Sequence, residues 1–129
     1  MERQRGYSLV EVLIALALIG IVVVAFLSAL ATSSRALILA DERTTAESIA
    51  RSEIEYVKKS AYDAANNPPQ YSRDPSLDIP SGYEVKITAQ RLDPEGDGAA
   101  DDDGIQRITV EVRHQGRLVL ASSDYKVNR

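Results

Sequence analysis

The chain has 129 residues and a formal net charge of −4 at pH 7, so we expect a single domain that does not attract nucleic acid by charge. It contains no cysteine, which excludes disulfides, thiolate metal sites and cysteine nucleophiles. Because His114 is the single histidine, a catalytic site would have to be built from carboxylates, hydroxyls and amines.

The chain starts with a short polar segment, residues 1–6, which contains Arg3 and Arg5. From Val12 to Ser34 there are 23 residues without a charge, most of them Leu, Ile, Val or Ala. A helix of ~20 apolar residues crosses the ~30 Å hydrocarbon core of a bilayer, so we predict that this segment enters a membrane. The positive-inside rule places the N-terminus in the cytoplasm and everything after Ser34 on the exported side.

Glu11 is a carboxylate at the edge of this apolar stretch, five positions after Gly6. A charge near the membrane core costs roughly 2.5–3.5 kcal/mol on insertion scales, so it usually has a partner. Cleavage after Gly6 would create an α-ammonium group on Tyr7 at the same depth. We predict a salt bridge between the Glu11 carboxylate of one subunit and the Tyr7 amine of the next, which would guide assembly.

The helix is predicted to continue beyond the membrane, because residues 34–62 contain no Pro and no Gly and are rich in helix formers. Apolar residues recur there at the helical period and form one stripe. The stripe consists of Leu39, Ala46, Ile49, Ala50, Ile54, Val57 and Ala61. We therefore predict one helix from about Ser8 to Tyr62, with an amphipathic continuation in the region 35–65, stopped by the prolines that begin at Pro68.

Apolar and polar residues alternate with a period of two in the last third of the chain, which predicts strands near residues 83–90, 107–113 and 118–125. His114-Gln115-Gly116 has the composition of a tight hairpin turn. Three antiparallel strands with one apolar face need a cover, and the stripe on the helix supplies one. The predicted fold class is α+β, with one long N-terminal helix packed by its second half on a small antiparallel sheet.

An acidic segment, residues 93–104, lies between the first two predicted strands. Its residues fit five positions of an EF-hand-like loop. Positions 1, 3, 5, 6 and 9 are occupied by Asp93, Glu95, Asp97, Gly98 and Asp101. Gly104 stands at position 12, where the EF-hand has a glutamate, and Asp103 could substitute as a ligand. Calcium is therefore a possible cofactor. The alternative interpretation is a solvated turn whose charges only keep it soluble.

The run from Gly6 to Leu16, Gly-Tyr-Ser-Leu-Val-Glu-Val-Leu-Ile-Ala-Leu, resembles the class III signal of type IV pilins and type II secretion pseudopilins. The resemblance covers the N-terminal segment, and the rest of the chain is similar in architecture only. It implies that an inner-membrane prepilin peptidase cuts between Gly6 and Tyr7 and methylates the new N-terminus at Tyr7. Glu11 falls on the glutamate of the family's fifth mature position, whereas Tyr7 replaces the usual Phe.

The resemblance implies a pilin-like structural subunit, and we therefore predict that the protein is not an enzyme. The sequence Glu-Val-Leu-Ile-Ala is more similar to minor pseudopilins than to major subunits. The implied partners are prepilin peptidase, other pilin or pseudopilin subunits and inner-membrane lipid. The chain would cross that membrane once, with its head in the periplasm or outside the cell, and would later join a filament. The domains are then a leader 1–6, a transmembrane and filament-core helix 7–34, an amphipathic helix 35–65 and a sheet head 66–129.

Other interpretations remain open. Ala29-Leu30-Ala31 fits the cleavage pattern of an ordinary secretory signal, which would release an exported domain, although the apolar run is longer than the usual 7–15 residues. A plain signal-anchor with a chance glutamate is a second possibility. The head could also belong to a calcium-dependent or DNA-binding minor pilin at a filament tip, although the acidic balance disfavours nucleic acid as a partner.

Overall fold

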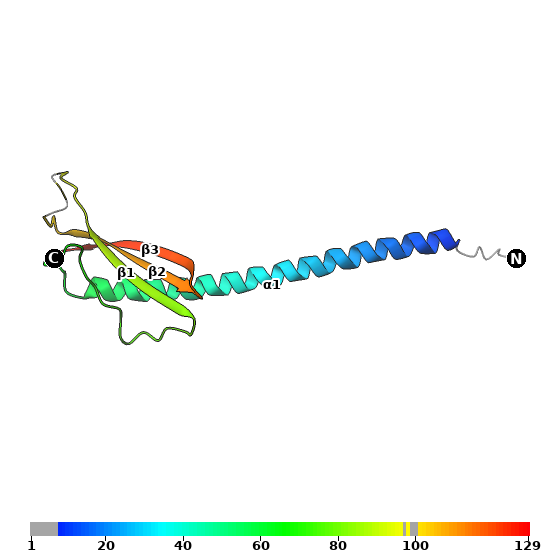
Figure 1. Ribbon diagram of the computed structural model, residues 1–129, viewed down its shortest axis with the longest axis horizontal. Coiled ribbons are helices and arrows are strands. Elements are labelled where there is room, and N and C mark those ends of the chain that lie inside the picture. Colours follow the sequence, from blue (N-terminus) through cyan, green and yellow to red (C-terminus); the bar gives the residue numbers. More distant parts are fainter. Residues whose placement is uncertain (1–7, 97, 99–100) are drawn as a thin grey trace. The chain divides into compact units, whose positions relative to one another are not determined.

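The computed structural model describes residues 8–96, 98 and 101–129, and the chain divides into two compact units between Leu39 and Ala40. The elements within the described residues are one helix, α1 (Leu9–Lys59), and three strands, β1 (Tyr83–Arg91), β2 (Ile105–His114) and β3 (Arg117–Val127) (Figure 1). This arrangement confirms the predicted α+β fold of one long helix and a small sheet.

The first unit, as far as it is described, consists mainly of residues 9–39 of α1. Leu, Ile, Val and Ala predominate and no proline interrupts the helix. Every large apolar side chain in this stretch is exposed, by 45% to 76%. The hydroxyls of Ser28 and Thr32 donate to the carbonyls of Val24 and Ser28 at 2.9 and 3.0 Å. These two polar groups are therefore satisfied inside the helix, and what the helix lacks is a cover for its apolar surface.

The sheet of the second unit is antiparallel in the order β1-β2-β3. Each strand extends beyond its predicted range, by no more than two residues at either end. β2 and β3 are joined by the predicted tight turn, in which Gln115 and Gly116 have φ values of 50° and 77°. Positive φ at both central residues is the requirement of a type I′ hairpin, whose twist matches that of the strands. The turn thereby sets the pairing of His114 with Arg117.

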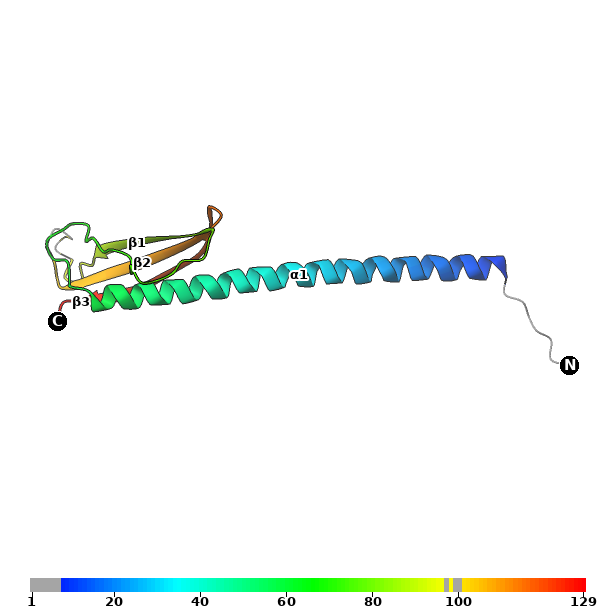
Figure 2. The ribbon, with the colours of Figure 1, turned by 90° about the horizontal axis from the view of Figure 1, so that it is seen from below.

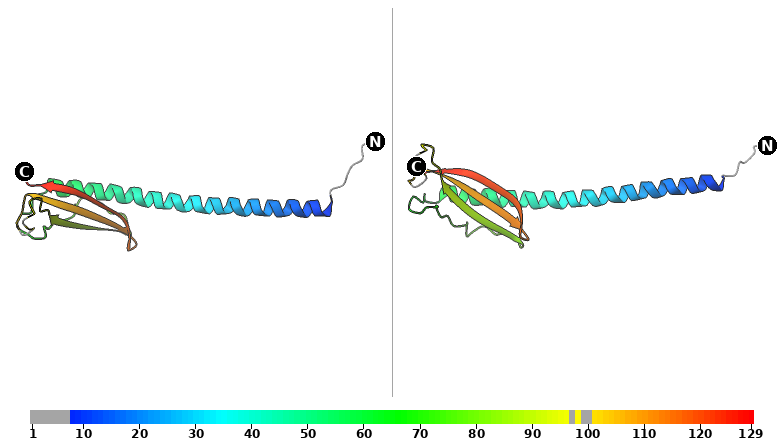
Figure 3. Two further views of the ribbon diagram at one scale, coloured as in Figure 1. Left: turned by 90° about the horizontal axis from the view of Figure 1, so that it is seen from above. Right: turned by 45° about the horizontal axis from the view of Figure 1, so that its top comes forward.

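The core lies between residues 40–59 of α1 and one face of the sheet, as Figures 2 and 3 show. Its buried apolar side chains are Ala46, Ile49, Ala50, Ile54 and Val57 from α1 and Ile108, Val110 and Val112 from β2. Fully burying one Ile or Val contributes roughly 1.5–3 kcal/mol. The predicted stripe is confirmed in its centre, whereas Leu39 and Ala61, at its two ends, are exposed.

Candidate functional site

Glu11 lies in the first turn of α1, where the amides of Glu11 and Val12 donate to the carbonyl of Ser8 at 3.0 and 3.2 Å. A carboxylate at this end interacts favourably with the positive pole of the helix dipole. Glu11 is exposed, and within the described part of the chain it forms no hydrogen bond or ion pair through its side chain. Gly6 and Tyr7 lie outside the described residues, so the cleavage position, the methylation of Tyr7 and the salt bridge to Glu11 stay predictions.

The apolar surface that follows Glu11 surrounds the helix. Every described residue from 8 to 41 is exposed, and Arg35 is the first charged residue after Glu11. Soluble monomers rarely expose an apolar patch of more than a few hundred Å². α1 is also long and apolar enough near the N-terminus to cross a membrane. This surface therefore needs lipid or other apolar helices around it.

Residues 1–27 match the protein family described as the prokaryotic N-terminal methylation motif. The match contains Gly6, Tyr7 and Glu11 and continues into the exposed apolar part of α1. The matched motif covers the N-terminal 27 residues and supports the resemblance to type IV pilins and pseudopilins. The comparisons with curated proteins and with solved structures gave no match. The match does not extend to the head, whose role has to be inferred from its own residues.

A buried carboxylate on α1 holds the loop that follows the helix. Glu53 is fully buried, and its Oε2 accepts a hydrogen bond from the Asp74 amide at 2.9 Å. Its Oε1 accepts from Arg73 Nε at 3.3 Å. Sequence reasoning missed Glu53, although it falls within the apolar stripe between Ala50 and Ile54. A charged residue within a buried stripe was the available signal, because such a residue is almost always paired.

The C-terminal end of α1 is capped by a lysine from β3. Lys126 is buried, and its ammonium group donates to the carbonyls of Val57, Lys58 and Ser60. Carbonyls at a helix end have no partner in the helix, so these bonds satisfy them. Burial lowers the pKa of Lys126 below its usual value. The helix ends at Lys59, three residues before the predicted end at Tyr62.

Two further buried side chains pin the same loop to the sheet. Gln106 accepts a hydrogen bond from the Tyr71 hydroxyl at 2.6 Å and donates to the Asp63 carbonyl at 2.8 Å. Arg91 donates to the carbonyl of Ala64 at 2.7 Å. The buried polar groups of Glu53, Lys126, Gln106 and Arg91 thus replace the hydrogen bonds that a loop without secondary structure lacks. They give the head a fixed connection between helix and sheet.

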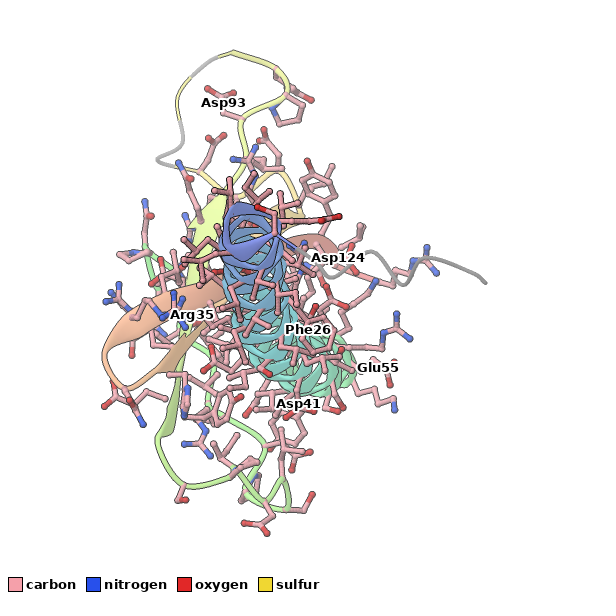
Figure 4. All side chains as sticks on the ribbon, turned by 90° about the vertical axis from the view of Figure 1, so that its right-hand side faces the viewer. Phe26, Arg35, Asp41, Glu55, Asp93 and Asp124 are labelled. Carbon is pink, nitrogen blue, oxygen red and sulfur yellow. The ribbon has the colours of Figure 1, made fainter. Side chains whose placement is uncertain are left out.

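The acidic loop between β1 and β2 is partly folded on itself, and Figure 4 labels Asp93 in this loop. The two carboxylate oxygens of Asp93 accept hydrogen bonds from the amides of Gly96 and Gly98 at 2.6 and 2.8 Å. Asp102 accepts from the Tyr62 hydroxyl at 2.6 Å, and burial, followed by this bond, raises the pKa of Tyr62.

These contacts leave the calcium prediction open. Asp97 lies outside the described residues, whereas Asp93, Glu95, Asp101 and Asp103 lie within them. Among the described residues, no three carboxylate or histidine side chains are grouped closely enough to hold a metal ion. Calcium at this loop therefore stays a prediction, which a calcium titration of the thermal unfolding temperature would test.

Proposed function

We propose that this chain is a minor structural subunit of a type IV pilus or a type II secretion pseudopilus. Prepilin peptidase removes residues 1–6, and the apolar segment of residues 7–34 then leaves the membrane to pack among the helices of neighbouring subunits. The head stands in the periplasm or outside the cell. The observation that carries the proposal is the methylation motif of residues 1–27 on a helix that is apolar and exposed all round.

The same apolar surface serves two environments in turn. Lipid covers it while the subunit waits in the inner membrane, and other subunits' helices cover it in the filament. Glu11 sets the register of neighbouring helices in the filament. An unpaired carboxylate is costly in an apolar surrounding, and the methylated Tyr7 amine of the next subunit neutralises it. Exposed Glu11, with no partner in the described part of its own chain, supports an intermolecular pairing.

Mass spectrometry of the mature N-terminus, isolated from cell membranes, tests the processing step. We expect a chain that begins at a methylated Tyr7. A start at Thr32 would mean that an ordinary signal peptidase releases a secreted domain, and the filament proposal would be wrong. An intact Met1 would leave a plain membrane anchor.

The variant Glu11→Ala tests the assembly step separately. We expect cleavage and membrane insertion to be retained and incorporation into sheared filaments to fall strongly, because Tyr7 loses its counter-charge. Glu84→Ala is the matched control, since Glu84 is an exposed glutamate of β1 in the head. Unchanged incorporation of the Glu11 variant would contradict the pairing.

The minor status of the subunit is tested by counting. The sequence Glu-Val-Leu-Ile-Ala that follows Val10 supports assignment as a minor subunit. Quantitative mass spectrometry of purified filaments should find this chain at a small fraction of the abundance of another pilin subunit. A filament built mainly of this chain would show a major subunit instead.

A further inference from the structure

The sheet has an open edge at β3. β3 is the last strand in the order β1-β2-β3, and within the described residues no fourth strand pairs with it. Native edge strands are commonly protected by proline, by lysine or by a bulge. β3 contains no proline, and Lys126, its lysine, is turned inward to cap α1. The irregularity in the register lies near the hairpin, beside Val112 and Arg113, so Leu120 to Val127 form a regular edge that can accept a strand.

A groove of about 790 Å³ lies between this edge and α1. Its floor is apolar and includes Ala50, Ile54 and Leu120. Lys58 on α1 and Asp124 on β3 both line it and form an ion pair of 2.8 Å. Both side chains of that pair are more than two-fifths exposed, and exposed pairs of this kind contribute little, so the pair does not bar entry. Figure 4 shows Glu55 and Asp124 on the same side of the head.

The helix wall of the groove carries charges of alternating sign. Glu47, Arg51, Glu55 and Lys59 line it at intervals of four residues. Four helical residues rise about 6 Å, and alternate side chains of an extended strand are about 6.7 Å apart. A strand whose alternate residues are acidic, basic and acidic can therefore set one charge against each of Arg51, Glu55 and Lys59.

The two central charges of this stripe are available. Glu47 accepts a hydrogen bond from Arg43 at 3.1 Å instead of pairing with Arg51. Across the described part of the chain, Arg51 and Glu55 have no hydrogen-bond or ion-pair partner. The edge strands of a second copy do not match this stripe, because the alternate residues of β1 and of β3 include no acidic, basic and acidic series. The matching segment is therefore an extended part of another protein.

We propose that the groove between α1 and the open edge of β3 receives an extended segment of a partner protein, which adds a fourth strand to the sheet. Backbone hydrogen bonds to β3 hold the segment, and its alternating acidic, basic and acidic residues face Arg51, Glu55 and Lys59. The aliphatic stems of these residues cover the apolar floor. The inference concerns the head alone and does not depend on filament assembly through residues 7–34.

The direct test uses the full-length protein in detergent micelles and short synthetic peptides. The first peptide alternates threonine with Glu, Lys and Glu, and the control peptide alternates threonine with Lys, Glu and Lys. We expect the first to bind at least tenfold more tightly than the control in fluorescence anisotropy. The pattern is symmetric, so the comparison does not depend on the direction of the bound strand. Equal binding of the two peptides, or no binding of either, would overturn the proposal.

Two changes separate strand addition from attraction between charges. The triple variant Arg51→Glu, Glu55→Arg and Lys59→Glu inverts the stripe and should reverse the peptide preference. These side chains are exposed, so the thermal unfolding temperature should stay close to that of the unchanged protein. Methylation of the backbone nitrogens in the first peptide should abolish binding, because it removes hydrogen bonds to β3. Undiminished binding of the methylated peptide would show that charge attraction alone holds it, and strand addition would be wrong.

A photo-cross-linking amino acid at Glu47, introduced in living cells, identifies the natural occupant. We expect an adduct with a partner protein whose cross-linked segment contains the acidic, basic and acidic alternation. The same amino acid at Glu84, on β1, is the control and should not give this adduct. An adduct with a second copy of the chain, or with lipid alone, would contradict the proposal.

Discussion

The two units share one helix but differ in how its apolar residues are covered. Residues 9–39 of α1 expose every large apolar side chain, whereas residues 46–57 bury theirs against the sheet wherever the stripe faces it. The first part is apolar all round, and the second is apolar on one side only. A helix that is apolar all round requires an apolar environment from outside, and an amphipathic one can be completed by its own chain. A change in one unit should therefore leave the other intact.

The largest effect is expected from Val110→Asp. Val110 is fully buried in β2, and an unpaired charge there costs about 4–5 kcal/mol or more. The head should unfold while membrane insertion continues, as measured by limited proteolysis of the full chain in membranes. Gln90→Asp is the control, because Gln90 is exposed on β1. A protease-resistant head in the Val110 variant would show that the core is not where the cooperative stability lies.

The reciprocal change is Val22→Asp in the first unit. Val22 is 65% exposed on α1, and an aspartate near the centre of a membrane helix costs about 2.5–3.5 kcal/mol of insertion free energy. The membrane-bound fraction should fall, while the unfolding temperature of the head in detergent stays the same. Val22→Ala is the control for size. A lowered unfolding temperature would show that the two units are coupled.

A smaller effect is expected from Lys126→Met, which keeps the length of the side chain but removes the cap of α1. The carbonyls of Lys58 and Ser60 lose the lysine donor, whereas the Val57 carbonyl keeps the Ser60 hydroxyl at 2.7 Å. The loss should cost about 1–3 kcal/mol of unfolding free energy. Thermal unfolding measures the loss, and Lys86→Met on exposed β1 should have almost none. An equal effect of both variants would mean that the cap does not stabilise the head.

The smallest effect is expected from Asp63→Asn and concerns pH. The amide of Gln70, followed by the side chain of Asn66, holds the pKa of Asp63 below its usual value. Because the pKa of Asp63 is lower in the folded than in the unfolded state, its ionised form stabilises the folded head at pH values above the ordinary pKa of aspartate. This stabilisation is lost as the pH falls through the pKa of the folded state. On acidification, the unfolding temperature of the variant should therefore fall by less than that of the unchanged head. Parallel acid profiles would contradict this assignment.

The local pattern of the sequence determined the membrane helix, the stripe, the three strands and the turn at Gln115 and Gly116. Each depends on residues within a few positions of one another, which is why the spacing of apolar residues and the need for positive φ suffice. The N-terminal motif is equally local, and the match to residues 1–27 supports the resemblance that the sequence indicated. The roles of Gly6, Tyr7 and Glu11 within it stay predictions.

Only the tertiary structure decided where α1 ends and which polar groups the head buries. Lys126 meets Val57 from 69 positions away, and Glu53 meets Asp74 across 21. No spacing rule connects such partners, because their approach depends on how the whole sheet packs on the helix. The open edge of β3 and the charged groove beside it arise from the same packing. A charged residue inside an apolar stripe indicates that it has a partner, but which residue is that partner depends on the tertiary fold.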